Sequence, residues 1–167
     1  MIFLIRGTSC SGKDTFCDKH FPSHTVLSSD QIRLQLLNDM KDQTKNAIVF
    51  DHLRLLLDMR IRFGSPFTVV NATNLKFKDI HAYLDIAQTY GEEVTVISID
   101  PPSVDELVRR MEKRSSEGGL EIPVSVLEKH HDSYFNCMDR FVEATEMYSN
   151  YAFVRIDQEW NIVNDSV

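Results

Sequence analysis

The chain has 167 residues, 43% hydrophobic and 26% charged, a composition typical of one soluble globular domain with a substantial core. Its 18 lysines and arginines against 25 aspartates and glutamates give a net charge of −7, which argues against broad nonspecific binding along duplex nucleic acid. The three cysteines show no zinc or CxxC spacing, and no apolar run approaches a membrane span. We therefore predict one domain over residues 1–167, cytoplasmic, with reduced thiols and no membrane contact.

The N-terminal stretch carries the most specific motif. Residues 1–5 are a short apolar run, as expected of a buried parallel strand. GTSCSGK follows at residues 7–13, a GxxxxGK pattern typical of a loop whose backbone amides hold phosphate oxygens, although an ordinary Gly/Ser turn is the alternative. A helix predicted over residues 13–20 would add its N-terminus, which favours anions. The expected phosphate-binding residues are Gly7, Thr8, Ser9, Cys10, Ser11, Gly12, Lys13, Asp14 and Thr15.

The residue after the motif lysine departs from the usual pattern. A hydroxyl residue normally follows this lysine and ligates magnesium, whereas this chain has Asp14 and then Thr15. A carboxylate is also a hard oxygen ligand of the kind that magnesium prefers. Alternatively, Asp14 is an acid in the first helical turn that only complements the helix dipole. We therefore treat Asp14 and Thr15 as candidate magnesium ligands.

The next strand and helix supply a candidate catalytic acid–base residue. Residues 24–27 form a predicted strand, and Ser28 and Gln31 have the spacing of a helix capping box. The carboxyl ends of parallel strands are where open sheets bind ligands, which makes Asp30 a candidate general base. The alternative is that Asp30 complements the helix dipole. Arg33, one turn later, would meet a second phosphate or remain solvated.

A long helix and a buried strand come next. The apolar spacing predicts a helix over residues 44–63, followed by a strand over 67–70. The strand runs into a polar segment, in which we expect Thr73 and Asn74 to contact substrate. In phosphate-loop enzymes this strand usually finishes near an acidic magnesium partner, but Ala72 occupies that place here. The side chains expected to face the core from the helix are Ile48, Val49, His52, Leu55, Leu56, Met59 and Phe63.

The remaining elements continue the alternation of strands and helices. We predict helices over residues 77–90, 104–113 and 124–147, and strands over 94–99 and 151–156. This order predicts an α/β fold with a parallel sheet of about five strands and helices on both faces.

Residues 103–130 have the pattern of a mobile lid. A basic helix is followed by a polar glycine-containing segment and a second helix, which is typical of a segment that closes over a bound substrate. Alternatively, the basic residues complement the dipole at the C-terminus of their helix. His130 and His131 lack a convincing metal-ligand spacing. The basic residues are Arg109, Arg110, Lys113 and Arg114.

The chain resembles the kinase domain of phage-type polynucleotide 5′-hydroxyl kinases over most of its length. Four segments carry the resemblance, in order: GTSCSGKDT at 7–15, SSDQIR at 28–33, VVNATNL at 69–75, and LVRRMEKR through IPVSVL across 107–127. The resemblance implies a P-loop kinase fold with a helical lid and without the family's phosphatase domain. It also implies the cytoplasm as the compartment, including that of a phage-infected bacterium.

The same resemblance implies residue roles. Lys13 and its neighbour would hold ATP and magnesium, and Asp30 would be the general base for the acceptor hydroxyl. Arg33 would hold the phosphate on the 3′ side of the nucleotide being phosphorylated. Arg114 would touch the transferring phosphate, with Arg110 one turn earlier.

Two departures from the family and several alternatives qualify this hypothesis. The family has a hydroxyl residue at position 14 and an aspartate at position 72, so we hypothesise that Asp14 replaces both metal-site functions. The resulting prediction is an ATP- and Mg²⁺-dependent kinase of the 5′-hydroxyl end of DNA or RNA, with single-stranded or terminal nucleic acid as partner. The alternative acceptors are a deoxynucleoside monophosphate, a hydroxymethylated base in DNA, or a small molecule. An alternative of another class is a non-catalytic nucleotide-binding regulator.

Overall fold

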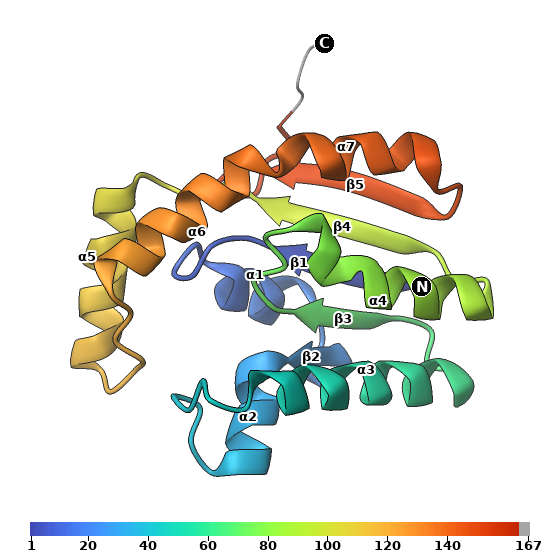
Figure 1. The fold of residues 1–167 in the computed structure, drawn as a ribbon, viewed down its shortest axis with the longest axis horizontal. Helices are drawn as coiled ribbons and strands as arrows, with labels where there is room; N and C mark the ends of the chain where they lie inside the picture. Colours follow the sequence, from blue (N-terminus) through green and yellow to red (C-terminus); the bar gives the residue numbers. More distant parts are fainter. Residues whose placement is uncertain (164–167) are drawn as a thin grey trace.

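A five-stranded, entirely parallel sheet forms the centre of the molecule. The computed structural model describes residues 1–163, so the last four residues of the predicted domain lie outside the described part. The strand order is β2-β3-β1-β4-β5, which places β1 between β3 and β4 (Figure 1). The predicted α/β fold with about five parallel strands is therefore confirmed. The strands are β1 Ile2–Arg6, β2 Val26–Ser28, β3 Thr68–Asn71, β4 Val94–Ile99 and β5 Tyr151–Ile156.

Helices cover both faces of this sheet. Helices α3, α4 and α7 pack on one face, and α1 packs on the other (Figure 1). The strands explain this division, because alternate residues of β1 point to opposite faces: Ile2 and Leu4 lie in one buried cluster and Ile5 in the other. The helices are α1 Lys13–His20, α2 Ser29–Leu37, α3 Asn46–Arg62, α4 Phe77–Tyr90, α5 Val104–Ser116, α6 Val124–Asn136 and α7 Met138–Met147, with a 3₁₀ turn at Ser23–Thr25.

The apolar face predicted for the long helix was half wrong. Within α3, Val49, Leu53 and Leu57 are fully buried against the sheet. By contrast, the side chains of Ile48, Leu55, Met59 and Phe63 are 55%, 52%, 42% and 82% exposed. The helix carries two apolar stripes at similar helical spacing, and the sheet covers only one of them. Hydrophobic periodicity cannot distinguish two such stripes, because both satisfy the same spacing.

Two predicted boundaries also differ from the structure. The helix predicted over 124–147 is two helices, α6 and α7, separated at Cys137, whose backbone has φ −104° and ψ 3°. This break turns the second half onto the sheet, where Phe141 is buried, whereas Phe135 in the first half is 46% exposed. The strand predicted over 24–27 begins only at Val26, because the preceding residues form the 3₁₀ turn.

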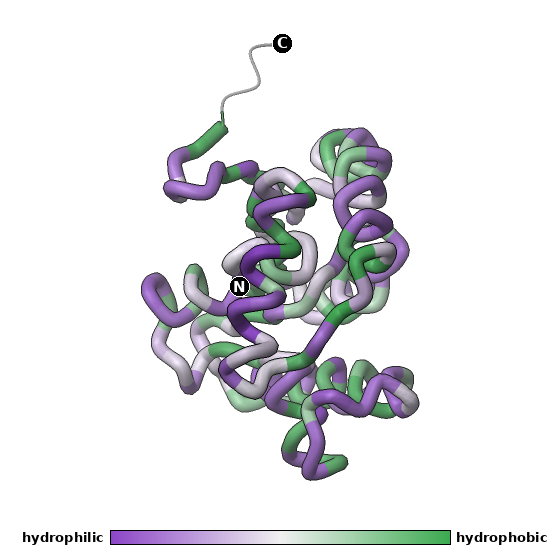
Figure 2. The backbone as a smooth tube through the Cα atoms, turned by 90° about the vertical axis from the view of Figure 1, so that its left-hand side faces the viewer, coloured by the Kyte–Doolittle hydropathy of each residue, from purple (hydrophilic) through white to green (hydrophobic). Residues whose placement is uncertain are grey.

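Helices α5 and α6 form a pair at one end of the sheet. They have their own small buried cluster, made of Leu107, Met111, Ile122 and Leu127, which is separate from the two clusters under the sheet. Figure 2 looks at the molecule from the side of Figure 1 on which α5 lies, and hydrophilic positions alternate there with hydrophobic ones along the helices. The helical pair predicted for the lid region is therefore present. Within the described residues, no helix is long and apolar enough to cross a membrane.

Candidate active site

The loop between β1 and α1 contains the two glycines of the GxxxxGK motif. Gly12 precedes α1 with φ 99°, a conformation that only glycine adopts readily. Gly7 is required for a different reason: a Cβ there would lie 2.7 Å from the Ser11 side-chain oxygen. The Gly7 amide donates to the carbonyl oxygen of Thr73 at 3.0 Å, which ties the start of the loop to the end of β3. Both motif glycines thus have a defined steric role.

Side chains inside this loop are buried with unfilled hydrogen-bonding capacity. The hydroxyl oxygens of Thr8 and Ser11 are buried and have no partner within the described residues. Lys13 extends its ammonium back over the loop and donates to the Thr8 carbonyl oxygen at 2.5 Å. Burial lowers the pKa of Lys13, and the carboxylates of Asp14 and Asp30 act against that shift. A buried cation and unsatisfied hydroxyls are the donor set expected for binding phosphate oxygens.

The loop opens into a cavity of about 810 Å³ at the carboxyl edge of the sheet. This is the edge at which parallel α/β sheets bind ligands. Gly7 and Thr8 lie behind the cavity wall, where Thr8 is fully buried. The cavity brings together most of the predicted site residues, namely Ser9, Cys10, Ser11, Gly12, Lys13, Asp14, Thr15, Asp30, Arg33, Thr73, Arg110 and Arg114.

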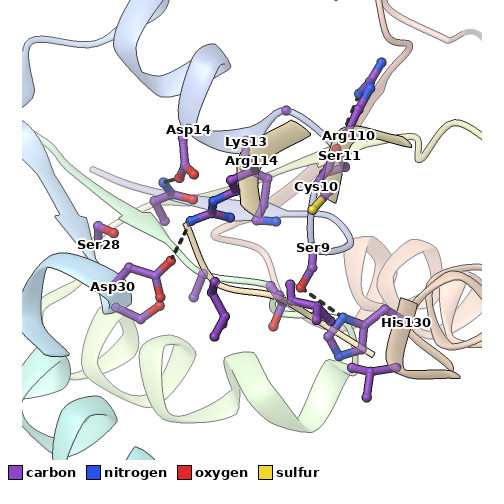
Figure 3. Close-up of a pocket in the computed structure, with 18 of the residues that line it drawn as sticks. Ser9, Cys10, Ser11, Lys13, Asp14, Ser28, Asp30, Arg110, Arg114 and His130 are labelled. Atoms are coloured by element: carbon purple, nitrogen blue, oxygen red, sulfur yellow. Dashed lines mark hydrogen bonds and ion pairs between the residues drawn. The ribbon is translucent and has the colours of Figure 1, made fainter. Parts of the chain in front are cut away.

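Asp30 lies at the start of α2 between two arginines. Its carboxylate accepts a hydrogen bond from Arg33 Nη1 at 2.6 Å and pairs with Arg114 Nη2 at 3.8 Å (Figure 3). The Asp30 side chain is 43% exposed in the cavity, whereas Arg33 is only 3% exposed and also donates to Asn46 Oδ1 at 2.8 Å. The Ser28 side chain caps α2 by accepting from the Gln31 amide, which sets the direction in which Asp30 projects. The structure thus places α2, α5 and the loop around one carboxylate.

The Asp14 side chain contacts the end of β3, which is next to β1 in the sheet. Asn71 donates from Nδ2 to Asp14 Oδ1 at 2.7 Å. Ala72, the next residue, is 4% exposed. A carboxylate is therefore present beside the carboxyl end of β3, although it comes from α1. Within the described residues no cluster of three or more His, Cys, Asp or Glu side chains forms a ready-made metal site.

Arg110, the other α5 arginine in the cavity, contacts the loop from the side opposite Asp30. Arg110 Nη1 donates to Gln158 Oε1 at 2.8 Å and approaches the Cys10 carbonyl oxygen at 3.4 Å. Figure 3 shows Asp30 and Arg110 at opposite sides of the pocket. Hydrogen bonds from Arg109 and Arg110 lower the pKa of Glu106 to about 2, so this carboxylate stays charged and orients both guanidinium groups.

The structure adds cavity residues that the sequence interpretation missed. His130 Nδ1 lies 3.1 Å from Ser9 Oγ and links α6 to the loop (Figure 3). Burial, together with the charge of Lys13, lowers the pKa of His130. Gln158 and Trp160 line the cavity from the segment after β5, and the first turns of α3 also contribute. For Gln158, Trp160 and the α3 residues, the only signal in the sequence was a position just after a strand or near the start of a helix.

Asn74 does not line the cavity as predicted. Its side chain is 3% exposed, and Nδ2 donates to the Ile5 carbonyl oxygen at 2.8 Å. Its backbone has a positive φ of 46°, and its side-chain hydrogen bond connects the segment after β3 to the end of β1. In this position Asn74 supports the loop from behind, whereas Thr73 faces the cavity.

Arg6, directly before the loop, is a fully buried cation. Its guanidinium lies 4.1 Å from the centre of the Tyr134 ring and 4.3 Å from that of Phe141. It donates to Ser98 Oγ at 2.8 Å and to the Tyr134 carbonyl oxygen at 2.5 Å. This group fastens β1 to the C-terminal half of α6, at the base of the helical pair.

Comparison with known families places the fold. Residues 2–136 match the family model AAA_33, which is described as an AAA domain. The chain belongs to this family. The fold is that of a P-loop kinase-like domain, in which the glycine loop joins β1 to α1. No curated protein sequence matches the chain.

Solved structures of low sequence identity share this fold. A chain of the Pnkp1/Rnl/Hen1 RNA repair complex is similar with a TM-score of 0.66 and 23% identity over 83% of this chain. The alignment covers 45% of that longer chain. The PezAT chromosomal toxin–antitoxin structure from Streptococcus pneumoniae has a TM-score of 0.67 and 14% identity, covering 99% of this chain and 70% of the other. A gluconokinase from Sinorhizobium meliloti has a TM-score of 0.50 and 15% identity, covering 92% and 81%.

Proposed function

We propose that this protein is an ATP-dependent kinase that transfers the γ-phosphoryl group of ATP to the 5′-hydroxyl end of DNA or RNA. The observation that carries the proposal is the position of Asp30 in the same cavity as the phosphate loop, paired with a buried arginine and a lid arginine. A phosphate-binding loop alone fits any nucleotide-binding protein. A carboxyl group in the same cavity supplies a base for an acceptor hydroxyl.

In this mechanism the protein positions the reactants and neutralises charge. The loop amides, the Ser11 hydroxyl and Lys13 bind the β and γ phosphates, because the GxxxxGK loop turns its amides toward the anion and the Ser11 hydroxyl has no partner within the described residues. Asp30 accepts the proton of the acceptor hydroxyl, whose oxygen bonds to the γ phosphorus while the bond to the bridging oxygen breaks and releases ADP. Arg114, which already reaches toward Asp30, neutralises the charge on the transferring group.

Asp14 is the residue proposed to hold magnesium. Its carboxylate is solvent-accessible within the cavity and is oriented by the Asn71 amide, so it offers a hard oxygen beside the phosphate loop. Thr15 lines the same cavity and offers a hydroxyl. A magnesium ion held by these residues would supply positive charge that offsets the negative charge of the phosphates. The contact with Asn71 supports the hypothesis that Asp14 replaces the carboxylate absent at Ala72.

Arg33 supports a nucleotide end as the acceptor. It is nearly fully buried, yet it lines the cavity and its Nε has no partner within the described residues. The guanidinium is thus held next to the proposed base with donor capacity to spare, as recognition of a phosphate beside the reacting hydroxyl requires. The overall acidic charge is consistent with contact at a strand end rather than along a duplex.

The test is phosphoryl transfer from γ-labelled ATP with magnesium to four separate acceptors. These are a 5′-hydroxyl oligonucleotide, a 3′-nucleotide, nucleoside monophosphates, and hydroxymethylated duplex DNA. We expect label at the 5′ end of the oligonucleotide, and loss of that label in Arg114→Ala. Label only on monophosphates or modified bases would overturn the acceptor and leave a kinase. Binding of ATP without transfer to any acceptor would favour a nucleotide-binding regulator.

A further inference from the structure

One aromatic side chain in the cavity lies outside the buried hydrophobic clusters of the fold. Within the described part of the chain, Phe50 on α3 belongs to none of the three buried hydrophobic clusters. Phe63, the C-cap residue of the same helix, is 82% exposed and, within the described residues, has no ring contact either. The chain has ten phenylalanines. The other eight contact another aromatic or histidine ring: Phe3, Phe16, Phe21, Phe67, Phe77, Phe135, Phe141 and Phe153.

Phe50 differs from Phe63 because it lines the active-site cavity. It is half-buried there, one helical turn after Asn46, and residues four apart lie on the same face of a helix. Asn46 Oδ1 accepts from Arg33 Nη2 at 2.8 Å, and Arg33 Nη1 contacts Asp30 at 2.6 Å. These contacts lead from the proposed base, through the buried arginine, to Asn46, which lies one helical turn before Phe50 on the same face of α3.

This order of groups matches the order of groups in a nucleotide. A 5′-hydroxyl at Asp30 belongs to a sugar that carries a phosphate on its 3′ side and a base on its other side. With the phosphate at Arg33, the base lies within reach of the face of α3 that carries Phe50. Aromatic rings bind bases by stacking, without a strong sequence preference, because each base offers a π face.

The donor nucleotide does not need this ring. Its phosphates would occupy the loop, and Arg110, which donates to Gln158, lies on the side of the cavity opposite Asp30 (Figure 3). Trp160 also lines the cavity, but its ring packs against Phe16 and His20. Phe50 is the cavity ring that follows the Arg33–Asn46 contact on the acceptor side. The size of the cavity, about 810 Å³, is at the upper end of the range for ligand sites.

We infer that Phe50 is the stacking platform for the nucleobase of the acceptor's 5′-terminal nucleotide. This inference rests on the proposed function and deepens it, since it makes the base itself, and not only the hydroxyl and phosphate, part of acceptor recognition. The site would favour acceptors that carry a planar ring and would discriminate against a sugar acid or an abasic sugar.

The test compares two acceptors that differ only in the terminal base: a 5′-hydroxyl oligonucleotide and the same oligonucleotide with an abasic 5′-terminal nucleotide. For the unaltered protein we expect kcat/KM to be about 5- to 150-fold lower for the abasic acceptor, the range of one base–aromatic stack. Phe50→Leu keeps an apolar side chain of similar bulk but cannot stack. It should lower kcat/KM for the normal acceptor to the abasic level, with no further loss on the abasic acceptor and an unchanged KM for ATP.

Two further variants control for folding and for position. Phe50→Tyr keeps an aromatic face and should retain the discrimination between the acceptors. Phe63→Leu alters an exposed phenylalanine on the same helix outside the cavity and should behave as the unaltered protein. The inference is overturned if Phe50→Leu loses the same factor on both acceptors, or if it still discriminates between them. Failure of the unaltered protein to phosphorylate either oligonucleotide is a separate result, which refutes the proposed function and the stacking site with it.

Discussion

Replacement of Asp30 separates its proposed catalytic role from its structural one. Asp30→Asn keeps a side chain of the same length, whose carbonyl oxygen can still accept a hydrogen bond from Arg33 Nη1. The amide cannot take a proton from an acceptor hydroxyl. Asp30→Ala removes both functions. Because Arg33 is only 3% exposed, the alanine variant leaves a buried guanidinium N–H without its partner.

The expected magnitudes differ between the two variants. Loss of a general base lowers kcat by about 10²- to 10⁴-fold in either one. An unsatisfied buried donor lowers the free energy of unfolding by about 1–3 kcal/mol, and only Asp30→Ala pays that cost. For a domain of this size, such a loss corresponds to a decrease in Tm of about 2–12 °C. Asp30→Asn should unfold within a few degrees of the unaltered protein.

Single-turnover transfer from γ-labelled ATP measures kcat, thermal unfolding by circular dichroism measures Tm, and calorimetry measures ATP affinity. ATP affinity should stay within about threefold in both variants, because Asp30 lies on the acceptor side of the loop. A kcat within threefold of normal in Asp30→Asn would refute the assignment of Asp30 as the base. Equal Tm values for Asp30→Ala and Asp30→Asn would show that the hydrogen bond from Arg33 Nη1 does not stabilise the fold, since both variants remove the ion pair.

Three other predictions test separate parts of the site. Asp14→Ala should remove the Mg²⁺-dependent turnover while Ala72→Asp retains it, as measured by kcat across a magnesium titration; normal turnover in Asp14→Ala would contradict a magnesium role. Arg6→Met should lower the free energy of unfolding by about 3–6 kcal/mol in urea denaturation, since it removes two charge-assisted hydrogen bonds worth about 1.5–3 kcal/mol each; a change below about 1 kcal/mol would show that these acceptors find other partners. Burial lowers the pKa of His130 below its unfolded value of 6.5, so the unfolded chain binds the extra proton first and stability falls as the pH drops through and below that value. His130→Gln should therefore lose less stability than the unaltered protein between about pH 7.5 and about pH 5, and parallel pH profiles would count against this assignment.

Several features were predictable because they depend on local physical constraints. The apolar run before GxxxxGK, the glycine conformations of the loop and the stop of α4 at Gly91, whose φ is 66°, follow from steric rules that act over a few residues. The same is true of Asp30 and Arg33, since a residue that follows a parallel strand lies at the ligand-binding edge. Asp14 could be recognised as unusual because it directly follows the motif lysine, where a hydroxyl residue is normal.

Other features depend on which surfaces meet after folding. Both apolar stripes of α3 satisfy one helical period, and only the position of the sheet decides that Leu53 is buried while Leu55 is exposed. Asn74 followed a strand as Thr73 did, but its side chain turned inward to the Ile5 carbonyl oxygen. The break at Cys137 likewise has no strong local breaker, and it is fixed by packing of Phe141 against the sheet.

The α/β fold, the GxxxxGK loop and the candidate base could be predicted from the sequence, because strand and helix periods and glycine sterics are local properties. Which distant residues share the cavity depends on how the sheet and helices pack. Three contacts join segments far apart in the chain: Asn71 with Asp14, Ser9 with His130, and Arg110 with Gln158. Nothing in the sequence indicates that these residues are partners. The same holds for Phe50, because its position in the sequence does not distinguish a cavity residue from a core residue. Only the packing of the sheet and helices makes that distinction.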